Sequence, residues 1–313
     1  MHWLASSSHH VGSAMSRVAD HSSKMQRARM SLDGLSVGDA FGEQFFVNPA
    51  KVDGLIAQRT LPAAPWHCTD DTVMALSIVD VLEEHGAIDQ EHLASLFARR
   101  YRNDVRRGYG GTAHGILRDI GIGLSWRSVA SAAFDGSGSM GNGGAMRAAP
   151  IGAFAELEPD FAAAEAAKSA AVTHAHLEGK AGAIAVAVAA SVVNSVNTPS
   201  DMFSAVLSLT PVGETHAGIS KASRLPLDFD VRTAVNALGN GSRVLSQDTV
   251  PFALWCAAKC FNSYVEAMWV TVAGLGDRDT TCAIVGGILA LRSAATPIPV
   301  DWLNAREPLD QLP

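Results

Sequence analysis

Apolar residues along this chain recur mainly at the three- and four-residue spacing of an amphipathic helix. Between residues 73 and 82, positions 73, 76, 79 and 82 are apolar, and positions 74, 78 and 81 widen the same stripe. The segment 90–102, QEHLASLFARRYR, repeats this pattern directly after Asp89, a residue type that often caps helices. Both segments are therefore predicted to be helices.

Four further segments predict helices. Two are rich in Ala, DFAAAEAAKSAAVTHAH and LEGKAGAIAVAVAASVVNSV, and the other two are TVPFALWCAAKC and TTCAIVGGILALRSA. Strict alternation over five or more residues is hard to find outside AIAVAVAA, where the alternating partner is Ala, which favours helix over strand. No repeat period or interdomain linker stands out, so we predict a single all-α domain.

The first segment of the chain differs from the rest in composition. It is rich in Ser, His and Ala and lacks the continuous apolar core of a secretory signal. We therefore expect a mobile leader over residues 1–28 and the helical domain over residues 29–313. Without a signal sequence, the expected compartment is the cytoplasm.

Composition excludes several classes of protein. Of the 313 residues, 48% are hydrophobic and 18% are charged, which is enough apolar surface for a large core. The net charge of −7 without a basic block argues against nucleic-acid binding, and the longest apolar run is too short to span a membrane. The four cysteines lack the spacing of a zinc site and are expected to be buried thiols: Cys68, Cys256, Cys260 and Cys282.

Two acidic motifs precede apolar helical segments about two hundred residues apart. One interpretation is helix capping, because Asp suits the positive end of a helix. The other is a binuclear site for hard cations, since Mg²⁺ and Mn²⁺ prefer oxygen ligands and capping needs only one Asp per helix. An EF-hand is excluded because Cys282 and Ile288 stand where Gly and Glu are needed. The residues of the two motifs are Thr69, Asp70 and Asp71, and Asp277, Asp279 and Thr280.

Glycine-rich segments between the predicted helices are candidates for ligand binding. GSGSMG (136–141) matches a dinucleotide fingerprint but lacks the strand–helix context that this fingerprint needs. Backbone N–H groups entering a helix near Gly144 suit a phosphate or a ribose hydroxyl, although a tight loop explains the glycines equally well. His174 and His176 are either metal ligands or hydrogen-bonded loop residues, and Tyr109 and His114 flank a loop where a ring could stack on a base.

Five segments occur in a fixed order between residues 34 and 290: GLSVGDAFG, CTDDTVMAL, RRGYGGTAHG, GSMGNGGAMRAAPIG with THAH, and GDRDTTCAIVGGILA. Together they resemble the ADP-ribosylglycohydrolase family, which includes the enzyme that removes ADP-ribose from dinitrogenase reductase and the ADP-ribosyl-acceptor hydrolases. The resemblance implies a compact orthogonal all-α fold with a binuclear Mg²⁺ or Mn²⁺ centre. It also implies hydrolysis of the bond between the anomeric ribose carbon and a modified acceptor, releasing ADP-ribose.

The resemblance assigns roles to matching positions. The metal ligands would be Thr69, Asp70, Asp71, Asp277, Asp279 and Thr280. The ADP-ribose would be held by Gly108, Tyr109, Gly110, Gly111, Ser139, Gly141, Asn142 and His174.

One departure from the family pattern affects the assignment of the catalytic acid or base. Many members carry Glu four residues after the last Gly of the first motif, where this chain has Phe46, while Glu43 directly follows Gly42. The catalytic candidates are therefore Glu43, acting from a shifted position, and Asp70 or Asp71, acting on a water molecule.

Three alternatives remain beside a hydrolase. The first is a relative that binds ADP-ribose with weak or no turnover, and the second is a structural protein, for which intact metal ligands would serve no purpose. The third, a di-iron bundle, would need Glu-x-x-His on two helices, and the sequence has no such pair. The expected partner is an ADP-ribosylated protein or small molecule, with no membrane and with nucleic acid only as a modified substrate. The expected oligomeric state is a monomer.

Overall fold

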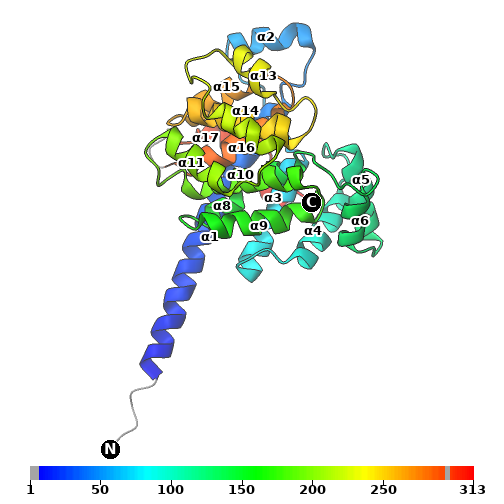
Figure 1. Cartoon of the computed structure of the whole chain (residues 1–313), viewed down its shortest axis with the longest axis vertical. Helices are drawn as coiled ribbons and strands as arrows, with labels where there is room; N and C mark the ends of the chain where they lie inside the picture. Colours follow the sequence, from blue (N-terminus) through cyan, green and yellow to red (C-terminus); the bar gives the residue numbers. More distant parts are fainter. Residues whose placement is uncertain (1–6, 293–296) are drawn as a thin grey trace, which may run out of the picture.

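The computed structural model describes residues 7–292 and 297–313. The secondary structure elements in this part of the chain are all helices. No strand occurs within these residues; two isolated bridges join Trp66 to Arg306 and Gly141 to Leu245. The predicted all-α class is confirmed (Figure 1). The α-helices are α1 (Ser7–Glu43), α2 (Pro49–Ala57), α3 (Asp70–His85), α4 (Gln90–Asn103), α5 (Gly111–Gly121), α6 (Trp126–Ala132), α7 (Gly143–Met146), α8 (Ala149–Phe154), α9 (Pro159–Ala171), α10 (Leu177–Val192), α11 (Pro199–Leu209), α12 (Glu214–Ala222), α13 (Val231–Leu238), α14 (Ser246–Lys259), α15 (Tyr264–Val272), α16 (Arg278–Leu289) and α17 (Val300–Ala305).

The helix α10 forms the centre of the packed structure. It is apolar on all sides, as expected of a helix surrounded by others, and nearly all of its residues are buried. Its small Ala side chains allow close contact with α8, α9, α11 and α14. The segment that showed alternation in the sequence is thus a core helix, as predicted from its Ala content.

Close packing of α1 against α16 brings distant parts of the chain together. Three glycines spaced four residues apart on α1 face α16, and a Cβ atom at any of them would overlap a backbone carbonyl of that helix. Along the two helices, Gly34 lies against Gly286, Gly38 against Cys282 and Gly42 against Arg278, so the helices are antiparallel. The end of α1 therefore lies beside the start of α16, where the second acidic motif is located.

The first helix extends further towards the N-terminus than the composition indicated. It begins at Ser7, and its N-terminal part projects beyond the other helices (Figure 1). Met25 and Ala28 are buried, and Arg27 donates a hydrogen bond to the carbonyl oxygen of Ala153. The packed part of α1 thus includes residues that precede the predicted boundary at residue 28. Residues 1–6 of the predicted leader lie outside the described residues.

The start of α4 has the cap that the sequence predicts. Asp89 caps α4 as predicted, since its side chain accepts a hydrogen bond from the backbone N–H of His92.

The four cysteines are free thiols; three are buried and Cys260 is partly exposed. Among the described helices, none has both the length and the apolar character that a membrane span requires.

Candidate active site

A cavity of about 670 Å³ opens where the first turns of α3 and α16 meet the glycine-rich loops. Its wall also includes the loop before α5, the segment around α7 and the residues between α9 and α10. Of the residues assigned by resemblance, those lining the cavity are Asp70, Asp71, Gly108, Gly110, Gly111, Ser139, Gly141, Asn142, His174, Asp277, Asp279 and Thr280. The structure thus brings the two acidic motifs and both glycine-rich loops to one cavity.

A cluster of three carboxylates, two of them on buried residues, lies at this site. One carboxylate oxygen from each of Asp39, Asp71 and Asp279 lies within 4.8 Å of the other two. Asp39 is held by four hydrogen bonds, which the backbone N–H and the hydroxyl groups of Thr69 and Thr72 donate. The side chain of Thr69 also donates to Asp71, at 3.1 Å.

Asp39 is a site residue that the sequence reasoning missed. It is the only charged residue in the segment GLSVGDAFG, in the interior of a helix, and it is fully buried. A buried carboxylate needs several hydrogen bonds or a nearby cation. A single acidic residue within an apolar helical segment was therefore the sequence feature that could have identified Asp39. Its position depends on the contact between α1 and the first turn of α3, which is not visible in the sequence.

Side-chain capping hydrogen bonds do not account for the carboxylates of the acidic motifs. The N-cap of α3 is Thr69, whose hydroxyl oxygen accepts a hydrogen bond from the backbone N–H of Asp71. Asp70 and Asp71 lie inside the first turn. Asp277 is the N-cap residue of α16, but its side chain makes no capping hydrogen bond. Capping by side-chain hydrogen bonds therefore explains none of these three carboxylates.

Burial and mutual repulsion disfavour ionisation of the cluster. Burial raises the pKa of Asp39 to about 6, and burial together with the charge of Asp39 raises the pKa of Asp70 to about 8. The pKa of Asp71 is raised well above its usual value by burial and then by Asp279, and that of Asp279 by burial and then by Asp277. This part of the cavity therefore has a strong excess of acidic groups.

Unpaired oxygen atoms show that the cluster fits a cation. Asp71 Oδ1 and Asp279 Oδ1 are buried and accept no hydrogen bond from the described residues. An unpaired buried carboxylate oxygen is costly, and a divalent cation with oxygen preference would satisfy it. The adjacent hydroxyl groups of Thr69 and Thr280 are ligands of the same type. The donor set thus suits Mg²⁺ or Mn²⁺ rather than a metal that prefers nitrogen or sulfur.

Asn142 and His174 form another part of the cavity wall. The side-chain amide of Asn142 donates to Asp277, at 2.7 Å, and to the hydroxyl of Thr249, at 3.0 Å. The ring of His174 packs so closely against Gly143 that a Cβ atom there would lie 2.8 Å from its Cε1 atom. Burial, followed by the charge of Arg147, lowers the pKa of His174 to about 3, so the ring is neutral.

Arg147 is a second site residue without an assigned role in the sequence analysis. It lines the cavity but is fully buried, and its guanidinium stacks on Phe97 at 4.5 Å. It donates to the carbonyl oxygen of Ser169 and to the hydroxyl of Thr173. Burial lowers its pKa to about 9, and the nearby Asp70 opposes this shift. Its position places a cation beside the acidic cluster.

Three assigned residues do not line the cavity. Thr69 is hydrogen-bonded to Asp39 and Asp71 of the cluster. Glu43 is the last residue of α1, where burial and the charges of Asp39 and Asp277 raise its pKa. Tyr109 is only 5% exposed and packs edge-on against the ring of Tyr101.

The remaining sequence candidates have local contacts. His114 lies within 2.9 Å of the Tyr101 hydroxyl through Nδ1, and His176 is the N-cap of α10. The helix expected near Gly144 is α7, which has a single turn. Neither Tyr109 nor His114 is among the residues that line the cavity, so neither ring forms its wall.

Comparison with known proteins identifies one family. The ADP-ribosylglycohydrolase model matches residues 20–313. The ADP-ribosylhydrolase ARH3 of Mus musculus is 29% identical over 278 residues, covering 78% of this chain and 74% of the mouse protein. ARH3 of Bos taurus is 30% identical over 273 residues, covering 76% of this chain and 74% of the bovine protein. A chain of a solved "ADP-ribosylglycohydrolase-related protein complex" superposes with a TM-score of 0.64 at 20% identity, covering 93% of this chain and 95% of its own; this likeness concerns the fold alone.

Proposed function

The chain belongs to the ADP-ribosylglycohydrolase family, and we propose that it hydrolyses the bond between ADP-ribose and a modified acceptor with the help of two divalent cations, Mg²⁺ or Mn²⁺. The observation that carries the metal dependence is the pair of unpaired buried oxygens in the acidic cluster, Asp71 Oδ1 and Asp279 Oδ1. The residues that would hold the ions are Thr69, Asp70, Asp71, Asp277, Asp279 and Thr280.

Asp39 is assigned a positioning role in this proposal. Its carboxylate already accepts four hydrogen bonds, so it fixes the first turn of α3 through Thr69 and Thr72. The hydroxyl of Thr69 is thereby held at a defined distance from Asp71. Loss of Asp39 would loosen the whole first turn rather than a single ligand.

The proposed ADP-ribose site is the part of the cavity formed by the glycine-rich loops. Gly108 adopts a left-handed conformation with φ of 87°, and a Cβ atom there would lie 3.4 Å from Asp70 Oδ1. Small residues leave the backbone N–H groups open to a ligand. The residues proposed to contact ADP-ribose are Gly108, Gly110, Gly111, Ser139, Gly141, Asn142 and His174, while Tyr109 would act from behind this wall.

The reaction needs a proton acceptor and a proton donor. A water oxygen forms a bond to the anomeric carbon of the ribose, and the bond from that carbon to the acceptor breaks, with its electron pair leaving on the acceptor. Bound divalent cations would supply positive charge that orients ribose hydroxyls and makes water more acidic. Asp70 or Asp71 takes the proton from the water. Glu43 does not line the cavity, but it is close enough to Asp39 and Asp277 for their charges to contribute to its raised pKa, and it is proposed to return a proton to the leaving acceptor.

A binding protein without turnover is the second candidate, and one observation favours it. Phe46 occupies the position where many family members carry Glu; it is 48% exposed and lies against Arg278, with the guanidinium 4.6 Å from the ring centre. An aromatic ring cannot transfer a proton at this position. If Glu43 does not replace the missing carboxyl, ADP-ribose would bind without being released from an acceptor.

Calorimetric titration of ADP-ribose, first with Mg²⁺ and then with EDTA, tests the proposal. We expect binding that EDTA weakens strongly, and release of ADP-ribose from an ADP-ribosylated peptide only with the metal. Asp279→Ala should abolish metal-dependent turnover while the helical content stays near that of the original chain. Binding without turnover on a panel of ADP-ribosylated substrates would favour the second candidate, and turnover unaffected by both EDTA and Asp279→Ala would refute the metal proposal.

A further inference from the structure

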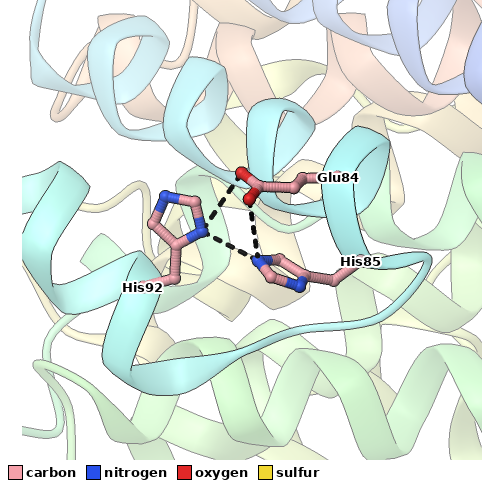
Figure 2. Close-up of side chains that lie close together, drawn as sticks. All are labelled: Glu84, His85 and His92. Carbon is pink, nitrogen blue, oxygen red and sulfur yellow. Dashed lines mark hydrogen bonds and ion pairs between the residues drawn. The ribbon is translucent and has the colours of Figure 1, made fainter.

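A second group of potential metal ligands lies on the surface, outside the cavity. Glu84 and His85 are at the C-terminal end of α3, His92 is in the first turn of α4, and the three side chains converge on one point (Figure 2). The ring nitrogens His85 Nε2 and His92 Nδ1 are 2.8 Å apart. The carboxylate oxygens of Glu84 lie 3.8 Å from the first nitrogen and 3.4 Å from the second. We propose that these residues bind a transition-metal ion of the zinc type.

The distances suit a tetrahedral ion after a small adjustment. Ligands about 2.0–2.1 Å from a tetrahedral zinc ion are separated from one another by roughly 3.3 Å. The separation of 3.4 Å between Glu84 and His92 already fits, and the 3.8 Å separation is slightly long. The two ring nitrogens need to move apart by about half an ångström, so the ion replaces the hydrogen bond between the rings. Such a shift needs only side-chain rotation at two partly exposed residues.

The backbone that carries the ligands is already fixed. Gly86 ends α3 in a left-handed conformation and donates its N–H to the carbonyl oxygen of Leu82. Two residues later, Ile88 is buried and its N–H donates to Glu165, at 2.6 Å. Asp89 then caps α4 through the N–H of His92. Because the turn between the helices is short and fixed at each step, little ordering is needed when an ion binds.

Charge around the site also favours a cation. Glu84 carries a negative charge, and the carboxylate of Asp89 lies close enough to interact with both imidazole rings. A divalent ion at this point would be bound by the Glu84 carboxylate and two imidazoles, with the Asp89 carboxylate nearby and a fourth coordination position left for water.

The ligand types separate this site from the acidic cluster. Two imidazoles and one carboxylate suit Zn²⁺, Co²⁺ or Ni²⁺, whereas Mg²⁺ prefers oxygen ligands alone. The surface site would join the end of α3 to the start of α4, so an ion here acts as a cross-link between two helices. The inference is independent of the proposed hydrolase activity.

The test measures Zn²⁺ and Co²⁺ binding to the full chain in the presence of saturating Mg²⁺. We expect the original chain to bind one more Zn²⁺ equivalent than the double variant His85→Gln/His92→Gln, and Co²⁺ absorption in the visible range to fall with it. Glu84→Gln should weaken this binding at least tenfold. The matched controls, Glu83→Gln on the same helix and His216→Gln on α12, should keep the additional equivalent.

A second readout uses thermal unfolding. Zn²⁺ should raise the melting temperature of the original chain and of both controls, and this increase should be smaller in the double variant. Equal Zn²⁺ stoichiometry and affinity in the original chain and the double variant would overturn the proposal. Because hydrolysis is assayed with Mg²⁺ alone, a failure of the proposed activity would leave the Zn²⁺ titration unchanged, so the two failures are distinguishable.

Discussion

Replacing Asp70 by Asn should stabilise the metal-free protein and weaken its response to Mg²⁺. Asp70 lines the cavity at the start of α3, and burial and the charge of Asp39 raise its pKa to about 8. At neutral pH the metal-free fold therefore keeps a proton on this group that the unfolded chain releases. Asn has almost the same shape and does not ionise, so it removes this cost. It also removes one of the negative charges that a bound divalent cation would need.

The magnitude follows from the two pKa values. The unfolded chain binds this proton only below a pKa of about 3.9, so between there and pH 7 the free energy of unfolding decreases by about 1.4 kcal/mol per pH unit. Over roughly three units the upper limit is about 4 kcal/mol. At about 2.1 cal/mol/K of unfolding entropy per residue, 313 residues give about 0.66 kcal/mol/K. A gain of about 3 kcal/mol would then raise the melting temperature by about 5 °C.

The assay compares melting temperatures at pH 7 in EDTA and in excess Mg²⁺. Asp70→Asn should melt a few degrees higher than the original chain in EDTA and gain less from Mg²⁺. Asp53→Asn on α2 is the matched control, because this side chain is exposed and does not line the cavity; it should change neither value by more than about 1 °C. A variant that is less stable in EDTA, or that gains as much from Mg²⁺ as the original chain, would refute the reasoning.

Three further predictions concern catalysis, packing and pH. Glu43→Gln should reduce the turnover rate more than it weakens ADP-ribose binding, and an unchanged rate in steady-state kinetics would move proton transfer to the aspartates. Gly38→Ala should destabilise the fold by several kcal/mol in urea unfolding, because its Cβ would overlap a carbonyl oxygen of α16. The control Gly54→Ala has open space around its Cβ and should be neutral or stabilising. Similar effects of the two substitutions would contradict the packing argument. In EDTA the free energy of unfolding should fall between pH 6.5 and 8, because carboxylates with raised pKa values keep their protons in the folded state and lose them in the unfolded chain. The lowered pKa of His174 has the opposite effect, but it adds stability only as the pH rises to about 6.5. Urea titrations at both pH values check the sign, and a rise over this interval would contradict it.

Much of the local structure could be predicted from the sequence because it depends on neighbouring residues. The three- and four-residue spacing of apolar positions specifies α3 and α4, and Asp89 caps α4 through an adjacent N–H group. The Ala content makes α10 a helix despite its alternating pattern. Likewise, two acidic residues before each of two helices are more than capping requires, and this excess indicated a cation site from the motifs alone.

Tertiary structure decided which residues meet. Asp39 joins the acidic cluster because glycines on α1 let that helix pack closely against α16, a contact between segments about 240 residues apart. Packing against Tyr101 leaves Tyr109 outside the cavity wall, although its motif borders the site. The pair of imidazoles on α3 and α4 meets only because a short turn folds one helix end back towards the other. The local pattern of residues thus determined the helices and the types of ligand side chain. Close approach between distant helices determined which side chains meet, because hydrogen bonds, charge repulsion and burial depend on distance in space.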